Sequence, residues 1–234
     1  MKHFIFLGII VFNVTISYTQ FSPHDLSFFE GDQEYIMNFS TKSSGNIVSY
    51  YLNDNWRTGS FILSTNKIIY DTPLKFDLLN NNLEIQYKNE IKVLGIEQLR
   101  EFSWKDDLKN NRRYINTNLL NIDIAYKGLS ELLVDDKVIL LKSYEIAQKL
   151  KKSNYGISAF SESYYVFHEL YLVNTETKEV LMIKRNRNKF YSFFSNDADI
   201  VSKYIEDKKL KFHKEIDLMN IVQYYNSINN SANN

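Results

Sequence analysis

The side chains that usually carry enzymatic chemistry are few in this sequence, and they do not form a catalytic pattern. The chain has four histidines, of which His24, His168 and His213 are far apart. His168 is followed by Glu169, as in the zinc motif H-E-x-x-H, but the second histidine of that motif is missing. We therefore predict no metal site and interpret His168 as an ordinary half-buried side chain on a strand.

The side chains that could act as nucleophiles do not form a catalytic pattern either. The chain has no cysteine, which excludes a thiolate nucleophile, a disulfide and a Cys-ligated metal. The nearest approach to the hydrolase motif G-x-S-x-G is Gly156-Ile157-Ser158-Ala159, which lacks the second glycine. Glycine-rich phosphate loops are also absent, so we expect no nucleotide and no other cofactor.

Acidic pairs leave one enzymatic alternative open. The acidic candidates for glycoside hydrolysis are Asp106-Asp107, Asp135-Asp136, Glu131, Glu162 and Glu169. They could serve this reaction only at a suitable carboxyl separation, and adjacent acids in turns are usually solvated. A hydrolase acting on envelope glycans or peptides would place His168 or His213 beside a serine or an acid in a cleft. We name no catalytic residue.

Aromatic and basic side chains supply the candidates for ligand binding. Exposed tryptophans can stack on sugars, and cations beside aromatic rings can bind anionic ligands. The candidate binding residues are Trp56, Trp104, Arg185, Arg187 and Lys189. The competing interpretation is that the rings belong to the core and that the cations are simply solvated.

The charge balance narrows the possible partners. The chain of 234 residues has 28 basic and 28 acidic side chains, so its formal net charge is zero. A neutral protein lacks the general attraction to polyanions, and we expect no nucleic-acid partner. With 17 tyrosines and 16 phenylalanines, the chain has ample apolar surface for a folded core.

The first nineteen residues resemble a secretory leader. Lys2 precedes the apolar run Phe4–Phe12, and Asn13 ends this run well short of the roughly 20 apolar residues of a membrane span. Ser17 and Thr19 fit the cleavage-site positions, which makes Gln20 the mature N-terminus; a cut defined by Thr15 and Ser17 is the alternative. We predict a secreted or periplasmic protein with no transmembrane segment in its mature chain.

Two-residue alternation of apolar and polar side chains indicates strands from Trp56 to Lys184. We predict hairpins and a meander over 59–63/67–70, 74–78/83–87/91–93, 129–134/137–141 and 164–173/178–183. The turns lie at Ser64–Asn66, Asn80–Asn82, Asn89-Glu90, Asp135-Asp136 and Asn174–Thr177. Residues 152–163 are interpreted as a connector.

After Lys184 the apolar residues recur with helical spacing. The pattern predicts a short helix around Phe190, a second helix capped by Asn196, and a third from Lys214 to Tyr225. The fold class is therefore α+β, with a mostly antiparallel sheet, flat or curved, and C-terminal helices packed on it. The predicted divisions are a signal peptide at 1–19, a β domain at 20–184, helices at 185–225 and a disordered tail at 226–234.

Several short segments together carry a resemblance. They are the glutamine at the cleavage site, Gly59-Ser60-Phe61, Pro73–Leu78, Leu83-Glu84-Ile85, Glu131–Val138, Lys189-Phe190, Ile200–Ile205 and Tyr224-Tyr225-Asn226. In these the chain, from about Asn55 to Ser227, resembles small secreted proteins of unknown function from Bacteroidetes-type bacteria. The resemblance implies a location in the cell envelope, and it brings no activity and no catalytic residues.

The sequence thus favours a non-catalytic binding or interaction module of the cell envelope. Its partner would be an envelope protein, a glycan or a lipid. Three alternatives remain open at this point. They are the envelope hydrolase described above, a carrier that holds an apolar ligand in the concave side of a curved sheet, and an adhesin-like or assembly subunit. A large exposed apolar patch or an unprotected sheet edge would mark the last of these.

Overall fold

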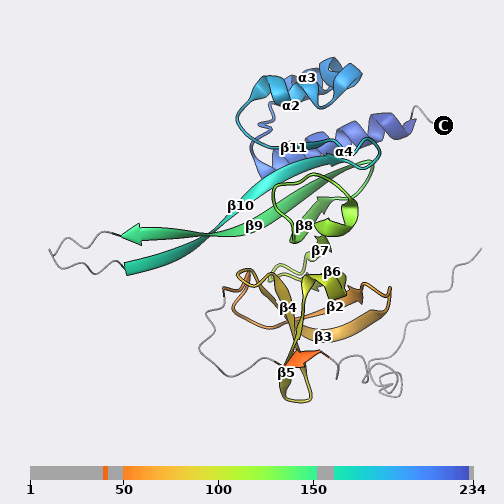
Figure 1. Cartoon of the computed structure of the whole chain (residues 1–234). Coiled ribbons are helices and arrows are strands. Elements are labelled where there is room, and N and C mark those ends of the chain that lie inside the picture. The colour runs from red at the N-terminus through yellow and green to blue at the C-terminus, as the bar shows by residue number, and fades with distance from the viewer. Residues whose placement is uncertain (1–38, 42–49, 152–160, 232–234) are drawn as a thin grey trace, which may run out of the picture. The chain divides into compact units, whose positions relative to one another are not determined.

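The computed structural model describes residues 39–41, 50–151 and 161–231 (Figure 1). The predicted leader and most of the predicted connector at 152–163 lie outside these ranges. Antiparallel strands and a group of helices near the C-terminus make up the described chain, which confirms the α+β class with an antiparallel sheet.

In the described residues, eleven strands form one open sheet in the order β1-β5-β4-β3-β2-β6-β7-β8-β9-β10-β11, and each pairs with its neighbour in the antiparallel sense. The strands are β1 (Ser40–Thr41), β2 (Arg57–Leu63), β3 (Ile68–Asp77), β4 (Asn82–Tyr87), β5 (Glu90–Leu94), β6 (Leu99–Lys105), β7 (Asn111–Asn116), β8 (Leu129–Val134), β9 (Val138–Lys151), β10 (Ser161–Asn174) and β11 (Val180–Met182).

The predicted hairpins all form, and asparagine carries several of the turns. Asn66, Asn81 and Asn89 adopt positive φ angles of 67°, 49° and 66°, which asparagine tolerates better than most residues. Asn89 shares a two-residue turn with Lys88, whose φ is 47°, as a type I′ hairpin requires. This turn lies one residue earlier than the predicted Asn89-Glu90.

The loop between β8 and β9 differs from its prediction. We expected a two-residue turn in which the aspartates adopt positive φ angles, but neither Asp135 nor Asp136 does so. Three residues, Asp135–Lys137, separate the two strands. The β8–β9 register also shifts between Leu132 and Val134, so a bulge absorbs the extra residue.

The connection from β5 to β6 requires the sheet to curve. In a flat sheet these strands would lie four spacings apart, about 19 Å. Only the four residues Gly95–Gln98 join Leu94 to Leu99, and a chain this short spans at most about 18 Å when fully extended. Ile96–Gln98 form a 3₁₀-helix (η2), which shortens the reach further. Strands β2–β6 must therefore curl so that β5 approaches β6.

A buried amide holds this connection in place. Asn116 at the end of β7 donates from Nδ2 to the carbonyl oxygens of Ile96 and Leu99, both at 2.8 Å. The Gln98 side chain accepts a bond from the Gly95 N–H at 3.0 Å. Where β2 meets β6, a Cβ atom on Gly59 would lie 2.1 Å from the backbone oxygen of Ser103, so this close approach requires glycine.

The sheet from β8 to β10 is covered on both faces. Val138 and Leu140 face a cluster with the helices, whereas Ile139 and Leu141 face a second cluster that includes Ile124 from the segment between β7 and β8. Burial on both faces explains why the apolar residues are consecutive in this part of β9 instead of alternating. The curved part of the sheet has its own buried aromatic group, in which the Phe102 and Tyr114 rings stack with centroids 4.5 Å apart.

Among the described residues, the α-helices that pack on β8–β11 are α2 (Arg187–Ser192), α3 (Ala198–Asp207) and α4 (Glu215–Ser231). Two details correct the predictions. The N-cap residue of α3 is Asp197, not Asn196, because a 3₁₀-helix (η4, Ser195–Asp197) precedes it. The polar segment from Asn226, predicted to be a disordered tail, continues α4 as far as Ser231.

The reason for the longer helix is a buried asparagine. Asn226 is 2% exposed. Its Nδ2 donates to the Val138 carbonyl oxygen at 2.8 Å, and its Oδ1 accepts from the Val138 N–H at 2.9 Å. The side chain thus satisfies both backbone groups at the start of β9, as a neighbouring strand would.

Replacing this asparagine tests how α4 is attached. In Asn226→Ala the Val138 N–H and C=O lose their partners inside the core, and we expect the free energy of unfolding to fall by about 2–4 kcal/mol in urea titrations. The exposed Asn220 on the same helix is the control, and Asn220→Ala should change stability by less than about 0.5 kcal/mol. Equal effects at the two positions would contradict this role for Asn226.

Candidate functional site

Glu131 on β8 has a deeply buried carboxylate, and its side chain is 3% exposed. It is part of a network of charged and hydrogen-bonded side chains. Its neighbours in the sheet are Tyr114 on β7 and Lys142 on β9. Glu131 accepts hydrogen bonds from Arg112 Nη1 at 2.9 Å and from the Tyr144 hydroxyl at 2.6 Å. A carboxylate this deeply buried needs such partners, because an unpaired charge in the interior is very costly.

The turn between β6 and β7 extends the network. Arg112 also donates from Nε to Asp106 at 2.9 Å. Asp106 in turn accepts the backbone N–H groups of Leu108 and Asn110, each at 2.9 Å, which fixes the turn. The next residue, Asp107, forms a bidentate pair with Arg57 at 2.6 and 2.9 Å.

These side chains surround a cavity of about 170 Å³. It is lined by Leu52, Asn53, Arg57, Trp104, Asp106, Asp107, Arg112, Tyr114, Glu131, Lys142 and Tyr144. Three cations line the cavity, and each of them pairs with a carboxylate. Arg57 and Arg112 have the partners described above, and Lys142 pairs with Glu215 of α4 at 2.8 Å. The volume is below the roughly 300 Å³ at which ligand pockets usually begin, and the charges already neutralise one another. The arrangement ties β2, β6, β7, β8, β9 and α4 together.

The phenols of this cavity are held in their neutral form. Burial raises the pKa of Tyr114 and of Tyr144 above the usual value, and the negative charge of Glu131 raises both further. A neutral phenol can donate a hydrogen bond, as Tyr144 does to Glu131, but it cannot act as a base.

The two histidines that the structure describes do not join the cavity. His168 lies on β10, as predicted, but it is exposed instead of half-buried, with its ring 6.4 Å from that of Tyr144. His213 is exposed beside Phe212. Within residues 39–41, 50–151 and 161–231, no group of three or more acidic or histidine side chains could hold a metal ion.

The five predicted binding residues are not brought together. Trp104 is 5% exposed and lines the charged cavity. Trp56 is half-buried, and the Lys75 ammonium lies 5.7 Å from its ring centre. Trp104 therefore belongs to the core, as the alternative to sugar binding in the sequence analysis had it.

The basic residues lie in and before α2, away from the lining of the charged cavity. Arg187 is exposed and contacts Tyr191 and Glu206, with its guanidinium 5.6 Å from the Tyr191 ring centre. Arg185 is exposed. Lys189 lines a separate groove of about 260 Å³ beside the edge strand β11. The remaining residues of this groove are Leu181, Met182, Ile183, Lys184, Asn186 and Phe190.

The most unusual feature of the described chain is a two-stranded arm. Strands β9 and β10 pair continuously from Val138–Asn174 to Lys151–Ser161. Their outer neighbours are much shorter: β8 pairs with β9 no further than Lys142, and β11 pairs with β10 only from Tyr171. We call residues 144–151 and 161–168 the arm; Figure 1 shows its strands running on together past the ends of their neighbours.

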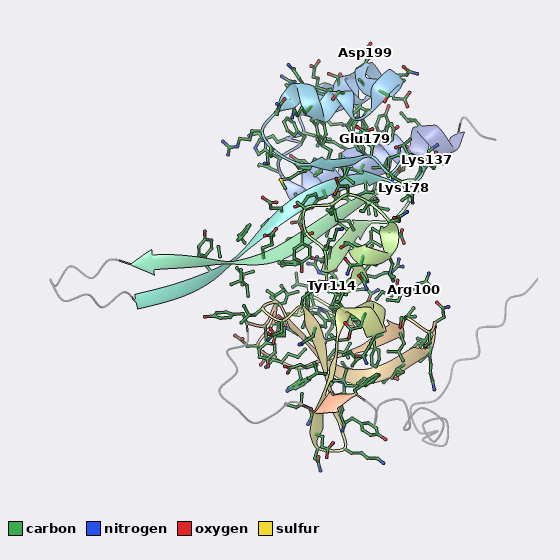
Figure 2. All side chains as sticks on the ribbon, in the orientation of Figure 1. Arg100, Tyr114, Lys137, Lys178, Glu179 and Asp199 are labelled. Carbon is green, nitrogen blue, oxygen red and sulfur yellow. The ribbon has the colours of Figure 1, made fainter. Side chains whose placement is uncertain are left out.

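The arm carries apolar side chains without the cover that they have in the sheet. Tyr165 is 51% exposed and Val166 is 43% exposed, whereas Leu172 and Val173 on the same strand are buried to within 1%. The Tyr165 and Phe167 rings lie 6.1 Å apart on one face. Figure 2 shows side chains of the arm that extend from the ribbon on both sides.

A pair of carboxylates lies at the base of the arm. Glu145 on β9 and Glu169 on β10 are diagonal neighbours on one face, and Glu169 accepts a hydrogen bond from the Tyr171 hydroxyl at 2.9 Å. Burial, followed by the negative charge of Glu169, raises the pKa of Glu145. A cation brought to Glu145 by a binding partner would be favourable there, because an opposite charge stabilises the ionised carboxylate.

Sequence reasoning missed the arm because it placed the hairpin ends at Leu141 and Tyr164. A signal was present, since apolar residues alternate through Tyr144, Ile146 and, by position, Leu150. The strands of 14 residues are far longer than the common 5–6. Such length beside shorter neighbours is visible only once the pairing is known.

Comparison of the chain with protein-family models, with curated proteins and with solved structures finds no match. The functional interpretation therefore depends on the sequence and on the geometry.

The buried phenols predict a loss of stability at alkaline pH. Burial, with a smaller contribution from the charge of Glu145, raises the pKa of Tyr126 to about 12, against about 10 in the unfolded chain. Below pH 10 both states keep the proton. As the pH rises from about 10 to about 12, the unfolded state loses its proton first, so the folded state is destabilised.

Tyr126→Phe measures this contribution. Between pH 9 and pH 11 the wild type should lose about 1 kcal/mol more unfolding free energy in urea titrations than the variant does. Parallel pH profiles for the two proteins would show that the Tyr126 phenol titrates normally in the folded state.

Proposed function

We propose that this protein is a non-catalytic interaction module that binds a protein partner through the β9–β10 arm. The single observation that supports the proposal is the arm itself, in which two long strands leave the sheet with exposed apolar side chains and, on each side, a backbone edge that pairs with no other described strand. Unpaired edges accept an added strand, and exposed apolar side chains give that pairing a hydrophobic component.

The energetics of a two-stranded ribbon favour the same function. An isolated pair of strands is at best marginally stable in water, and stability normally requires a third strand or a packed face. The base of the arm is anchored, because Leu140, Leu141 and Tyr171 are buried in the sheet. Beyond the base, a partner strand would supply the missing hydrogen bonds and cover the apolar face.

The charged cavity supports binding over catalysis. Its carboxylates and cations are engaged with one another, and Tyr144 is held as a hydrogen-bond donor. A general acid or base needs a free group of suitable pKa beside a substrate-sized space. The cavity instead stabilises the base of β9, from which the arm extends.

The cellular location belongs to the same proposal. Residues 1–19 have the pattern of a secretory leader, and the resemblance to secreted proteins of Bacteroidetes-type bacteria implies the cell envelope. In the described part of the chain, none of the helices combines the length and apolarity of a membrane span. We propose that the mature chain acts outside the cytoplasm, either in the periplasm or beyond the cell.

Photo-crosslinking in the native host tests the arm. A photoreactive amino acid at Tyr165 should give a discrete covalent adduct, because this side chain would be covered by the partner. Leu108 is 80% exposed on the β6–β7 turn and is the matched control, where we expect no discrete adduct. The mass of the adduct, measured by mass spectrometry, identifies the partner. No adduct at Tyr165, or equal adducts at both positions, would refute the proposed function.

Export is tested separately by the mass of the mature chain. We expect protein isolated from the native envelope fraction or the medium to begin at Gln20, as measured by intact mass and N-terminal peptides. A chain that retains Met1–Thr19 in the cytoplasm would refute the location and leave the function of the arm to the crosslinking result.

A further inference from the structure

The groove formed by residues of the edge strand β11 and of helix α2 is apolar with basic residues among its lining. Four of its lining residues are apolar, and one of them, Phe190, is 1% exposed. The polar lining residues are Lys184, Asn186 and Lys189, and no acid is among them. A ligand that matches this lining combines an apolar group with a negative charge.

The cations of this groove are not neutralised within the described part of the chain. In the charged cavity every lining cation pairs with a carboxylate. By contrast, none of the described carboxylates forms an ion pair with Lys184, with Lys189 or with Arg185 between them. The Asn186 side chain is engaged, because its Oδ1 accepts the Lys189 backbone N–H at 3.1 Å and caps α2. The two ammonium groups are therefore available to an incoming carboxylate.

Strand β11 also presents backbone groups at its outer edge. The Ile183 N–H donates to the Leu170 carbonyl oxygen at 2.8 Å, toward β10. Because such bonds alternate along an antiparallel pair, the N–H and C=O groups of Met182 and Val180 point away from β10. β11 is the last strand of the described sheet, so these groups face the side on which a further strand would add.

The size of the groove favours a peptide over a whole small molecule. Its volume of about 260 Å³ is below the roughly 300 Å³ at which pockets for small ligands usually begin. A peptide needs space here only for a side chain, since its backbone would pair with β11. In an extended peptide, side chains two residues apart share a face and lie about 7 Å from each other. An acid two residues from the apolar side chain is thus within reach of the flexible Lys184 and Lys189 side chains.

We infer that this groove binds an extended peptide of a partner protein in which an acidic residue lies two positions from an apolar residue. The peptide adds a strand to β11, its apolar side chain contacts Phe190, and its carboxylate pairs with Lys184 and Lys189. This goes beyond the proposed function, because the lining of the groove includes no residue of the arm. The groove is a second contact surface at the opposite end of the β10 strand.

Synthetic peptides test the inference on the purified full chain by fluorescence anisotropy. The acidic probe is a labelled Thr-Glu-Thr-Val-Thr-Glu-Thr peptide with blocked ends, in which the valine and both glutamates share a face. The basic probe has lysine in place of each glutamate, and the serine probe has serine in place of the valine. We expect both of these to bind about fivefold or more weakly than the acidic probe, because each loses one half of the complementarity.

Charge reversal in the protein identifies the cations. The double variant Lys184→Glu/Lys189→Glu should reverse the preference, so that the basic probe binds more tightly than the acidic probe. Lys203→Glu, a change at an exposed lysine on α3, is the matched control and should leave the preference of the wild type unchanged. All three substituted positions are exposed, and we expect thermal unfolding of both variants to match that of the wild type.

Amide hydrogen exchange, measured by NMR, tests the added strand. The Met182 N–H points away from β10, so a saturating amount of the acidic probe should slow its exchange about tenfold or more. The Ile183 N–H, which is already bonded to Leu170, is the internal control and should exchange slowly with and without the probe.

Three results would overturn the inference. They are equal binding of the acidic probe and either of the other two probes, an unchanged preference in the double variant, and unchanged exchange at Met182 when the acidic probe is bound. None of these measurements involves Tyr165, so the crosslink on the arm decides the proposed function separately.

Discussion

The continuous pairing of β9 with β10 is the interaction on which the rest of this structure depends. The two strands form one ladder of 14 residues each, but the ladder has two environments. At one end both faces are buried, by the helices on one side and by the β7–β8 segment on the other. At the other end the same ladder continues beyond the last residues at which the described strands β8 and β11 pair with it. The buried end supplies the stability that a free ribbon lacks, and it fixes the direction in which the arm extends.

The elements around the base of the arm are joined by buried polar groups. Asn226 gives α4 a strand-like attachment to Val138. Glu131 collects bonds from Arg112 and Tyr144, which link the β6–β7 turn to β9. Such contacts are specific because each buried donor or acceptor has one partner that satisfies it, and any other arrangement would leave it unpaired. The charged cavity is therefore best understood as part of the scaffold that holds the arm.

A curved sheet was among the predicted forms, and its curvature has a simple cause. The connection of four residues between β5 and β6 cannot cross three intervening strands unless the sheet curls. The inner side of the curl is filled by Phe61, Phe76 and Phe102, each no more than 1% exposed. A carrier of an apolar ligand would need space where these rings pack, so the described interior favours an interaction surface outside the curl.

Much of the local structure could be predicted from residue patterns. Alternation identified the hairpins, and asparagine identified their turns, because both signals depend on neighbours in the chain. The errors occurred where distant residues decide. Asn226 looked like part of a polar tail because its partner, Val138, is 88 residues away. The candidate set Trp56, Trp104, Arg185, Arg187 and Lys189 was chosen by residue type, and the fold places Trp104 and the basic residues in different parts of the structure.

The sequence by itself determined the antiparallel α+β class, the positions of the hairpins and helices, and the absence of disulfide and thiolate chemistry. Local propensity, hydrophobic period and the lack of cysteine are sufficient for these conclusions. Only the tertiary structure decided which strands are neighbours, and hence that β9 and β10 extend beyond the strands beside them. Whether an apolar side chain on a strand belongs to a core or to a binding surface depends on what covers it, and that cover comes from segments far away in the chain.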